Sequence, residues 1–292
     1  MRFFIVDAFT EKIFGGNPAG IVLLGPDADF PDEDVMTKTA AELRYSETAF
    51  VKPVSDKELK LRYFTPEAEV DFCGHATIAA FTVLSDTGFA KAGSSYLIDT
   101  LSGKLAIDIK DDSIMMEMPA PKLIKGFDDP GDIEELYKIL GIDPGRGSAD
   151  FPPELISTGF PDIFLYVKDY QSLGAIAPDF GALSAFTKKH GAGGVHVFTL
   201  DVLEPGITAR ARNFAPLFGI NEEAATGTAS GGLIYYLFLH GAVSARQSCY
   251  FLQGEAMGRP SKISASIESS DLDCKIKVGG KGAILASGEI HL

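Results

Sequence analysis

The sequence has few cysteines and no long uninterrupted hydrophobic run. Of 292 residues only three are cysteine, Cys73, Cys249 and Cys274, and no two of them form a Cys-x-x-Cys pair. An odd, sparse set argues against a disulfide framework and favours a reducing compartment. No apolar run approaches the about 20 residues of a membrane helix, and Asp7 interrupts the N-terminal apolar stretch too early for a signal peptide. We therefore expect a cytoplasmic protein outside the membrane.

Positive charge is also scarce. The chain has 26 basic and 40 acidic residues, which gives a net charge of −14. An acidic surface repels phosphate backbones, so we expect no nucleic-acid partner. There is no basic amphipathic stretch that would bind an anionic membrane. A small-molecule substrate remains the expected partner.

Several cofactor and catalytic motifs are absent. The sequence has no Walker loop, no H-E-x-x-H and no nucleophile elbow. Gly191-Ala192-Gly193-Gly194 has the look of a dinucleotide loop, but it precedes an expected strand instead of opening a helix. No His, Cys and carboxylate cluster has the spacing of a zinc site. We therefore expect neither a nucleotide cofactor nor a metal.

Length and composition predict a globular protein of two domains. Hydrophobic residues make up 46% and charged residues 23% of the chain, and a domain usually spans roughly 100–200 residues. Pro119-Ala120-Pro121 and the acidic stretch that follows mark a change of domain. We predict domains at residues 1–118 and 119–278, with the last strand, about residues 279–292, a candidate to join the first domain.

Strand-like segments outnumber helix-like ones, which predicts an α/β (α+β) fold. Hydrophobic periodicity and apolar runs indicate helices at residues 31–43, 76–84, 133–140, 183–190 and 229–240. Most of the remaining apolar segments are of strand length. The runs at 76–84 and 229–240 are apolar on all sides and are therefore expected to be buried helices.

Two segments of the chain resemble each other. Arg62-Tyr63-Phe64-Thr65-Pro66 is matched 150 residues later by Arg212-Asn213-Phe214-Ala215-Pro216. Each is followed by a glycine, Gly74 or Gly227, that opens one of the expected buried helices. A short similarity that also predicts the same strand, loop and helix indicates duplication of one α/β unit.

The starts of these two helices are candidate anion sites. The first backbone N–H groups of a helix have no partner within it and, with the helix dipole, attract negative charge. Two such starts, at Gly74 and Gly227, would stabilise a carboxylate or a forming enolate. The alternative is ordinary capping, with Thr77 and Thr228 as the caps.

Glu47 and His75 are the candidate proton-transfer residues. Glu47 lies directly before an apolar strand and is either a surface acid or a general acid/base whose pKa is raised by partial burial. His75 lies at a helix start, which disfavours the imidazolium, so we expect a neutral ring that orients a substrate, relays a proton or is simply structural. Glu69 and Asp71 are its candidate partners.

The motifs together resemble those of the phenazine-biosynthesis isomerase-like (PhzF-like) family, which has the diaminopimelate-epimerase-like fold. The resemblance runs nearly end to end and rests on the order and spacing of short segments, namely Asp7-Ala8-Phe9-Thr10, Gly16-Asn17-Pro18-Ala19, Ser46-Glu47-Thr48-Ala49-Phe50, Phe64-Thr65-Pro66, residues 69–77, Ser157-Thr158-Gly159-Phe160-Pro161, residues 212–216, residues 225–229, Gln253-Gly254 and residues 257–261.

This resemblance implies two similar domains, each a curved, mostly antiparallel sheet wrapped around a central apolar helix, with the active site in the cleft between them and a homodimer as the assembly. It implies Glu47, His75, Glu223 and Thr228 as catalytic residues, and Ser46, Gly74, Ala76, Thr226 and Gly227 as substrate-binding residues. The family motif Glu-Asp-Pro-Ala-Thr-Gly-Ser-Ala reads Glu222-Glu223-Ala224-Ala225-Thr226-Gly227-Thr228-Ala229 here. Glu223 thus stands in place of Asp, and Thr228 in place of Ser.

The expected function is that of a cofactor-independent isomerase that transfers a proton on a small carboxylate-bearing substrate, with Glu47 as acid/base. One alternative is an amino-acid racemase or epimerase that uses Cys73 with Glu47. Epimerase relatives use two thiols, and Thr226 occupies the second position here. A hydroxyl is a poor base, which weighs against that alternative. Another alternative is a binding protein that keeps the fold without the chemistry.

Overall fold

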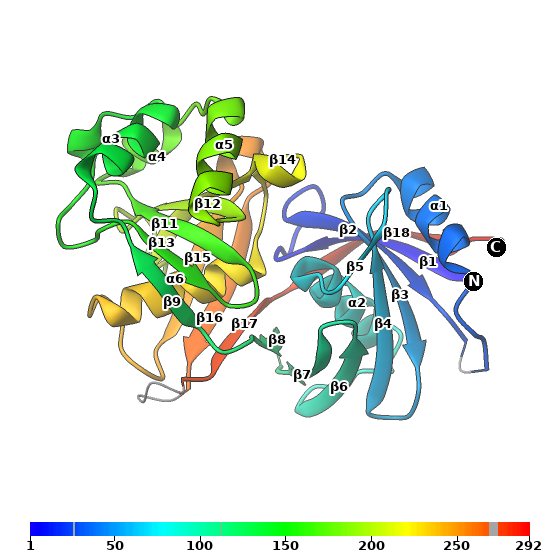
Figure 1. The fold of residues 1–292 in the computed structure, drawn as a ribbon. Helices are drawn as coiled ribbons and strands as arrows, with labels where there is room; N and C mark the ends of the chain where they lie inside the picture. The colour runs from blue at the N-terminus through cyan, green and yellow to red at the C-terminus, as the bar shows by residue number, and fades with distance from the viewer. Residues whose placement is uncertain (26, 112, 269–273) are drawn as a thin grey trace. The chain divides into compact units, whose positions relative to one another are not determined.

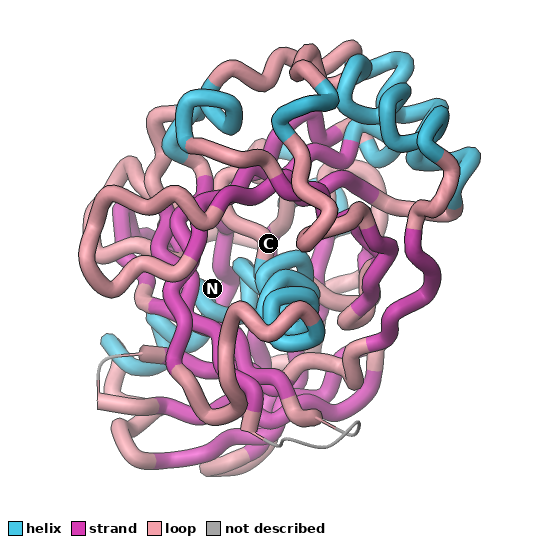
Figure 2. Tube along the Cα trace, turned by 90° about the vertical axis from the view of Figure 1, so that its left-hand side faces the viewer, coloured by secondary structure: helices cyan, strands magenta, loops and turns pink. Residues whose placement is uncertain are grey.

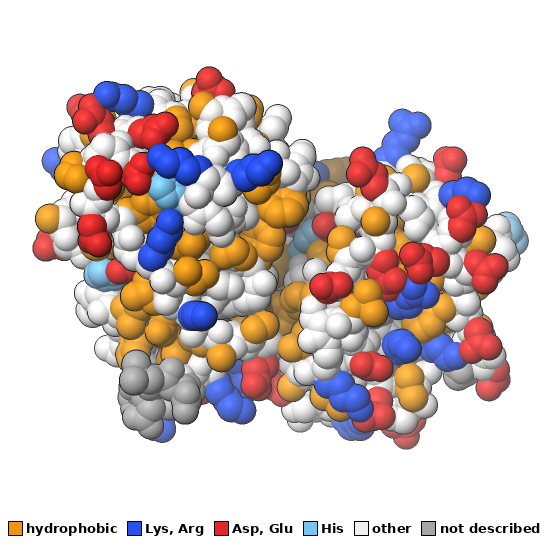
Figure 3. Space-filling view, viewed as in Figure 1, with side chains coloured by type: hydrophobic (Ala, Val, Ile, Leu, Met, Phe, Trp, Pro, Cys, Tyr) orange, Lys and Arg blue, Asp and Glu red, His pale blue; other side chains and the backbone are white. Residues whose placement is uncertain are grey.

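The computed structural model describes residues 1–292 except 26, 112 and 269–273. The chain divides into two compact units (Figure 1). Unit 1 is Met1–Glu117 with Gly279–Leu292, and unit 2 is Met118–Val278. Among the described residues, no helix is long and apolar enough to cross a membrane. On the face drawn in Figure 3, acidic and basic side chains are interspersed over the surface of each unit.

Unit 1 is built from strands around one buried helix. Its helices are α1 (Glu33–Leu43) and α2 (Gly74–Asp86). Its strands are β1 (Arg2–Ala8), β2 (Asn17–Leu23), β3 (Thr48–Pro53), β4 (Glu58–Phe64), β5 (Glu69–Val70), β6 (Ser94–Thr100), β7 (Gly103–Ile109), β8 (Ile114–Glu117) and β18 (Gly282–Glu289). The pairs β2–β3 and β4–β6 are parallel, and the pairs β1–β18, β1–β2, β3–β4, β4–β5, β6–β7 and β7–β8 are antiparallel.

Helix α2 forms the centre of unit 1. Nine of its side chains are buried. It contacts strands from the beginning of the unit's sequence, β1, β2 and β3, and from its end, β8 and β18. A helix that is apolar all round must be covered on every side, and the curved sheet supplies that cover. Helix α1 instead contacts β3 and β4, where Met36 and Ala40 pack with Phe50 and Phe64.

Unit 2 repeats this design. Its helices are α3 (Pro130–Ile139), α4 (Tyr170–Gly174), α5 (Phe180–His190) and α6 (Gly227–Leu239). Its strands are β9 (Lys122–Gly126), β10 (Glu154–Ser157), β11 (Pro161–Tyr166), β12 (Gly194–Thr199), β13 (Ala209–Ala215), β14 (Ile220–Glu223), β15 (Ser248–Gln253), β16 (Ser261–Ile267) and β17 (Ile276–Gly280), the last of which runs on into unit 1. Helix α6 packs against β10, β11 and β16, so strands enclose it as they do α2 (Figures 1 and 2).

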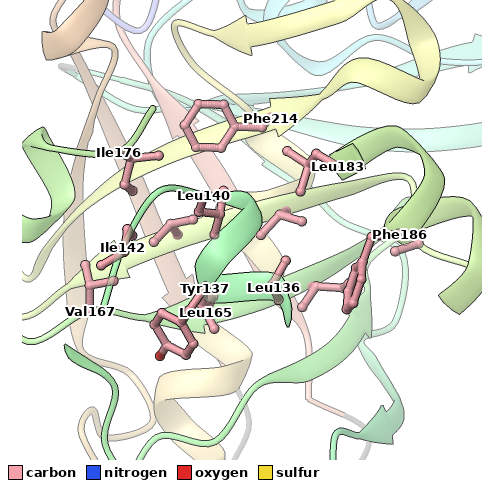
Figure 4. Close-up of a cluster of buried hydrophobic side chains, with 14 of the residues drawn as sticks. Leu136, Tyr137, Leu140, Ile142, Leu165, Val167, Ile176, Leu183, Phe186 and Phe214 are labelled. Carbon is pink, nitrogen blue, oxygen red and sulfur yellow. The ribbon is translucent and has the colours of Figure 1, made fainter. Parts of the chain in front are cut away.

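Close packing of α6 requires a glycine. A Cβ at Gly232 would lie 2.4 Å from the ring of Phe164 on β11, so only a residue without a side chain lets the helix approach the sheet this closely. On the opposite face of the sheet, α3 and α5 cover a second core, which is shown in Figure 4. That core includes Leu136, Leu165, Leu183 and Phe214.

The two units share one order of strands. In unit 2 the pairs β11–β12 and β13–β15 are parallel, and the pairs β10–β11, β12–β13, β13–β14 and β15–β16 are antiparallel. Each of these pairings has the same direction as the corresponding pairing in unit 1 when β10 is taken as the equivalent of β1 and α6 as the equivalent of α2. The predicted fold class, two similar mostly antiparallel sheets around apolar helices, is confirmed.

Local differences from the sequence prediction are small. Asn17 and Pro18, a pair typical of turns, instead begin β2, where Asn17 pairs with Ala8 of β1. Helices α2 and α6 begin at the two glycines expected to open them, Gly74 and Gly227, whereas α3 and α5 begin three residues earlier than predicted, at Pro130 and Phe180. Helix α4 was not predicted, because five residues are too short for a periodic pattern.

Candidate functional site

Three of the chemistry-bearing side chains of unit 1 meet at the start of α2. Nε2 of His75 lies 3.2 Å from Oε2 of Glu47, and Nδ1 of the same ring lies 3.4 Å from Sγ of Cys73. Oγ of Ser46 lies 3.5 Å from Nε2 of His75. The side chains of Glu47 and His75 are only 16% and 5% exposed. The site is therefore a compact, mostly buried acid–imidazole–thiol group.

The local fold fixes this geometry. Glu47 directly precedes β3, and its carbonyl accepts a hydrogen bond from the N–H of Gly20 on the neighbouring parallel strand. Cys73 is the extended N-cap of α2, which puts His75 in the first helical turn. Thr77 lies one turn later, and its hydroxyl donates to the carbonyl of Cys73 at 2.8 Å. Thr77 is thus inside the helix and does not cap it, contrary to the capping alternative.

The charge state of Glu47 differs from the expectation. Burial raises the pKa of its carboxyl, but the adjacent His75, together with Ser46 and Cys73, outweighs burial and leaves the pKa below its usual range. The predicted upward shift is wrong, because the sequence did not show which partner would face the acid. Glu47 is therefore an ionised carboxylate at neutral pH.

His75 also differs from the expectation. Burial lowers the pKa of His75, but Cys73 and Glu47 outweigh this effect, and the pKa lies well above its usual range. The expected neutral ring is therefore wrong, since a carboxylate at 3.2 Å stabilises the imidazolium more than the helix start destabilises it. Glu69, a predicted partner, instead binds Arg62 at 2.7 and 2.5 Å.

Burial keeps the thiol of Cys73 protonated. Burial and the charge of Glu47 raise its pKa, although His75 and the N–H of Ala76 act in the opposite direction. Cys73, His75 and Glu47 also form the one group of candidate metal ligands found among the described residues, with ligand atoms within 4.8 Å of one another. A thiolate, an imidazole and a carboxylate suit zinc, so the same three atoms could bind a metal or move a proton.

In unit 2, Glu223 belongs to a hydrogen-bonded group at the start of α6. Its Oε2 accepts a hydrogen bond from the hydroxyl of Thr226 at 2.7 Å. Gln253 on β15 holds both, since its Nε2 donates to the carbonyl of Glu223 at 2.7 Å and to the hydroxyl of Thr226 at 3.0 Å. Its Oε1 accepts the N–H of Thr226 at 3.2 Å. Gln253 was noted only as part of a family motif, and its bridging role was missed.

The adjacent acid, Glu222, has a different partner. It forms a paired interaction with Arg212, with two contacts of 2.8 Å. This pair repeats Arg62 with Glu69 in unit 1. Glu222 therefore anchors β14 on β13, and Glu223 is left to face the start of α6.

The remaining predicted binding residues also lie at the two helix starts. Gly74 and Ala76 belong to the first turn of α2, and Gly227 and Thr228 to that of α6. Cys73 and Thr226 are the N-cap residues, and neither makes a side-chain capping hydrogen bond. The carbonyl of Thr228 accepts the hydroxyl of Thr158 at 2.7 Å. By contrast, α3, α4 and α5 are each capped by an aspartate. Thr228 is not the cap of α6 either.

Two buried ionisable residues of unit 2, Asp162 and His196, were missed by the sequence analysis, and Asn213 was noted only as part of the repeat. Asp162, His196 and Asn213 are 1%, 0% and 2% exposed. Nδ1 of His196 lies 3.0 Å from Oδ1 of Asn213, and burial lowers the pKa of His196 to about 4. The available signal was a polar residue within an otherwise apolar strand, as in Phe160-Pro161-Asp162-Ile163-Phe164.

The chain is similar to known proteins along nearly its whole length. The family model of phenazine biosynthesis-like proteins matches residues 6–288. An uncharacterised isomerase of Bacillus subtilis is 32% identical over 287 residues, which cover 96% of this chain and 94% of that protein. Trans-2,3-dihydro-3-hydroxyanthranilate isomerase of Pseudomonas chlororaphis is 31% identical over 299 residues, which cover 100% and 99%.

Solved structures agree with this similarity. The crystal structure of a PhzF-family phenazine biosynthesis protein from Bacillus anthracis has a TM-score of 0.89 and 26% identity, and the match covers 100% of this chain and 99% of that one. The fold and the named relatives define an isomerase. More narrowly, the chain belongs to the phenazine biosynthesis-like (PhzF) family.

Proposed function

We propose that this isomerase moves a proton between carbon atoms of a small carboxylate-bearing substrate without a cofactor, with Glu47 as acid/base. The observation that carries the proposal is the 3.2 Å approach of the Glu47 carboxylate to the His75 imidazole at the start of α2. An ionised carboxylate beside a positively charged ring is a base that can accept a proton.

In the proposed reaction Glu47 takes a proton from a C–H carbon, and the bonding electrons stay on the substrate as a delocalised carbanion. The same carboxyl then returns the proton to a conjugated carbon, so no proton is lost or gained overall. Burial already acts to raise the pKa of Glu47. When a bound substrate displaces water, this effect increases and makes the carboxylate a stronger base.

The uncapped starts of α2 and α6 support a negatively charged substrate. The N–H groups at Gly74 and Gly227 open two long, buried helices whose N-caps make no side-chain capping bond. Such groups stabilise a carboxylate in the ground state and a developing enolate in the transition state. We propose that Glu223, held by Thr226 and Gln253, orients polar groups of the substrate.

Deuterium incorporation in D₂O, followed by NMR, tests this proposal. The panel contains trans-2,3-dihydro-3-hydroxyanthranilate, because a relative is named for its isomerisation, with other cyclic dienyl amino acids, small carboxylates and free amino acids. We expect exchange at one carbon, and a loss of about 10²–10⁴-fold in turnover for Glu47→Gln. Glu42→Gln, a change at an exposed residue of α1, is the matched control. Unchanged turnover in Glu47→Gln would show that Glu47 is not the base.

A racemase that uses Cys73 with Glu47 is the second candidate. The 3.4 Å approach of Sγ to Nδ1 of His75 favours it, since such a contact could deprotonate the thiol. The raised pKa of Cys73 acts against it. Cys73→Ala separates the two, because it abolishes racemisation of an amino acid but leaves an isomerase that depends on Glu47. Binding of a panel compound without any exchange would favour a binding protein.

We also propose that the protein assembles as a homodimer, because the resemblance to the family implies that state. Sedimentation equilibrium of the purified chain measures it directly. A mass of one chain at all concentrations would contradict this proposal and would leave the chemistry of Glu47 unaffected.

A further inference from the structure

One buried acid of unit 2 has no role in the proposed reaction. Asp162 on β11 is 1% exposed, and neither of its carboxyl oxygens has a hydrogen-bond partner in the described part of the chain. Other aspartates of unit 2 accept backbone N–H groups at helix starts, as Asp129, Asp169 and Asp179 do. A carboxylate buried without a donor is costly, so a group in this position favours its neutral form.

The internal repeat shows what Asp162 corresponds to. Thr48 pairs with Phe64, and Val195 pairs with Phe214, so Gly194 occupies in unit 2 the place that Glu47 occupies in unit 1. A Cβ at Gly194 would lie 2.7 Å from Oδ1 of Asp162. The carboxyl of Asp162 therefore fills the space beside β12 that a side chain at the Glu47-equivalent position would need.

Asp162 and Glu223 lie on the same face of the sheet, the one that α6 covers. Asp162 is opposite Gly194, His196 is opposite Asn213, and Asn213 is opposite Glu223. Residues opposite each other or two apart on a strand share a face. The ring of Phe164, two residues after Asp162, contacts α6 and so identifies that face.

Few other titratable groups share this face among the described residues. His196 from β12 and Glu223 from β14 are the nearest in register to Asp162. Glu154 of β10 lies 3.2 Å from His240 beyond the far end of α6. The ionisable residues of α6 itself are Tyr235 and Tyr236. Burial raises the pKa of Asp162 to about 8, and the charge of Glu223 acts in the same direction.

We propose that Asp162 is a positioning residue of unit 2 that keeps its proton at neutral pH, so that Glu223 stays ionised and hydrogen-bonded to Thr226. Asp162 touches no reacting atom and acts through Glu223. When Asp162 loses its proton, a second negative charge develops on the same face, repels Glu223 and weakens its hydrogen bond to Thr226. Asp162 thereby sets the upper pH limit of activity.

The first test is independent of any substrate. The infrared spectrum at neutral pH is expected to contain the carbonyl stretch of a protonated carboxylic acid, and Asp162→Asn is expected to remove it. Asp150→Asn, which changes an exposed aspartate of unit 2, is expected to keep it. If the Asn variant does not fold, ¹³C NMR of the wild-type aspartate carboxyls gives the same information. The proposal would be overturned if no carboxyl group were found to titrate near neutral or mildly alkaline pH.

The second test rests on the proposed role of Glu223 and uses the pH profile of kcat/KM. For the wild type, a fall of about tenfold is expected between neutral pH and about pH 9, one unit above the pKa of Asp162. In Asp162→Asn this fall is expected to be absent, while Asp150→Asn keeps it. An infrared band that disappears in Asp162→Asn with an unchanged alkaline fall would show that Asp162 holds a proton but does not control Glu223. Lack of activity in every variant would instead count against the proposed function.

Discussion

Replacement of Asp162 by Asn is expected to change how the stability of unit 2 depends on pH. The pKa of Asp162 is raised to about 8 in the folded protein from 3.8, its ordinary value. Between these values the folded state binds more protons than the unfolded state. The free energy of unfolding therefore falls as pH rises, because folding must retain a proton that the unfolded chain releases.

The size of the change in unfolding free energy follows from the width of the pH interval between these two pKa values. Each pH unit inside it corresponds to about 1.4 kcal/mol, so between about pH 5 and pH 7 the wild type loses about 2.7 kcal/mol through this one group. Asn has the shape of the protonated acid but does not titrate. Its amide adds a desolvation cost, but this cost is the same at every pH. The stability of Asp162→Asn relative to wild type should therefore rise by about 2.7 kcal/mol over this interval.

Urea unfolding at several pH values, followed by fluorescence and far-UV circular dichroism, measures this difference. For a unit of this size the same change corresponds to roughly 5–10 °C in Tm. Asp150→Asn, at an exposed position of unit 2, controls for the loss of a carboxyl group. A relative stability that stays constant from about pH 5 to pH 7 would refute the reasoning, because it would mean that Asp162 is already ionised in the folded state.

Three further results are expected. Arg212→Ala removes the buried partner of Glu222 and the donor to two carbonyls around α4; urea unfolding should show a loss of about 3–5 kcal/mol, and an unchanged midpoint would contradict this. Gly232→Ala places a Cβ 2.4 Å from the Phe164 ring and should cost about 1–3 kcal/mol in the same assay, whereas a neutral change would mean that the helix can shift. Zinc should inhibit turnover by binding to Cys73, His75 and Glu47, and a chelator should restore it. Inhibition should be weaker in Cys73→Ser, and equal inhibition of that variant and the wild type would mean that the metal binds elsewhere.

Much of the fold was readable from local pattern. The segments that became α2 and α6 are apolar on all sides, and such segments need a sheet around them. The echo of Arg62–Pro66 in Arg212–Pro216, each followed by a glycine and an apolar helix, indicated two similar units. In the structure the arginine of each copy pairs with an acid on the next strand. Helix ends were less accurate, since they depend on which backbone groups find partners after folding.

The candidate site was only partly predictable. Motif spacing indicated Glu47 and His75, but it could not give their charge states. A pKa shift is the balance of burial and partners, and both are set by which side chains meet in three dimensions. For Glu47 the balance is decided by His75, which is 28 positions away in the chain. The apolar neighbours of Asp162 in sequence hinted at its burial, but they could not show that its carboxyl meets no hydrogen-bond donor in the described part of the folded chain.

The two copies of the repeat have diverged in the carboxyl group that they place beside the central helix. In unit 1 it is Glu47, whose pKa is lowered. Its negative charge stabilises the folded state at pH values above 4.5, the ordinary pKa of the group, and this contribution is lost as pH falls through the lower pKa of the folded state. In unit 2 it is Asp162, whose pKa is raised, so its contribution is present at acid pH and is lost as pH rises towards 8. Relative to wild type, Glu47→Gln should therefore become less destabilising as pH falls below about 4.5, and Asp162→Asn less destabilising as pH rises above about 4. If the stability relative to wild type changed with pH in the same direction for both variants, this division into a charged base and a neutral acid would be contradicted.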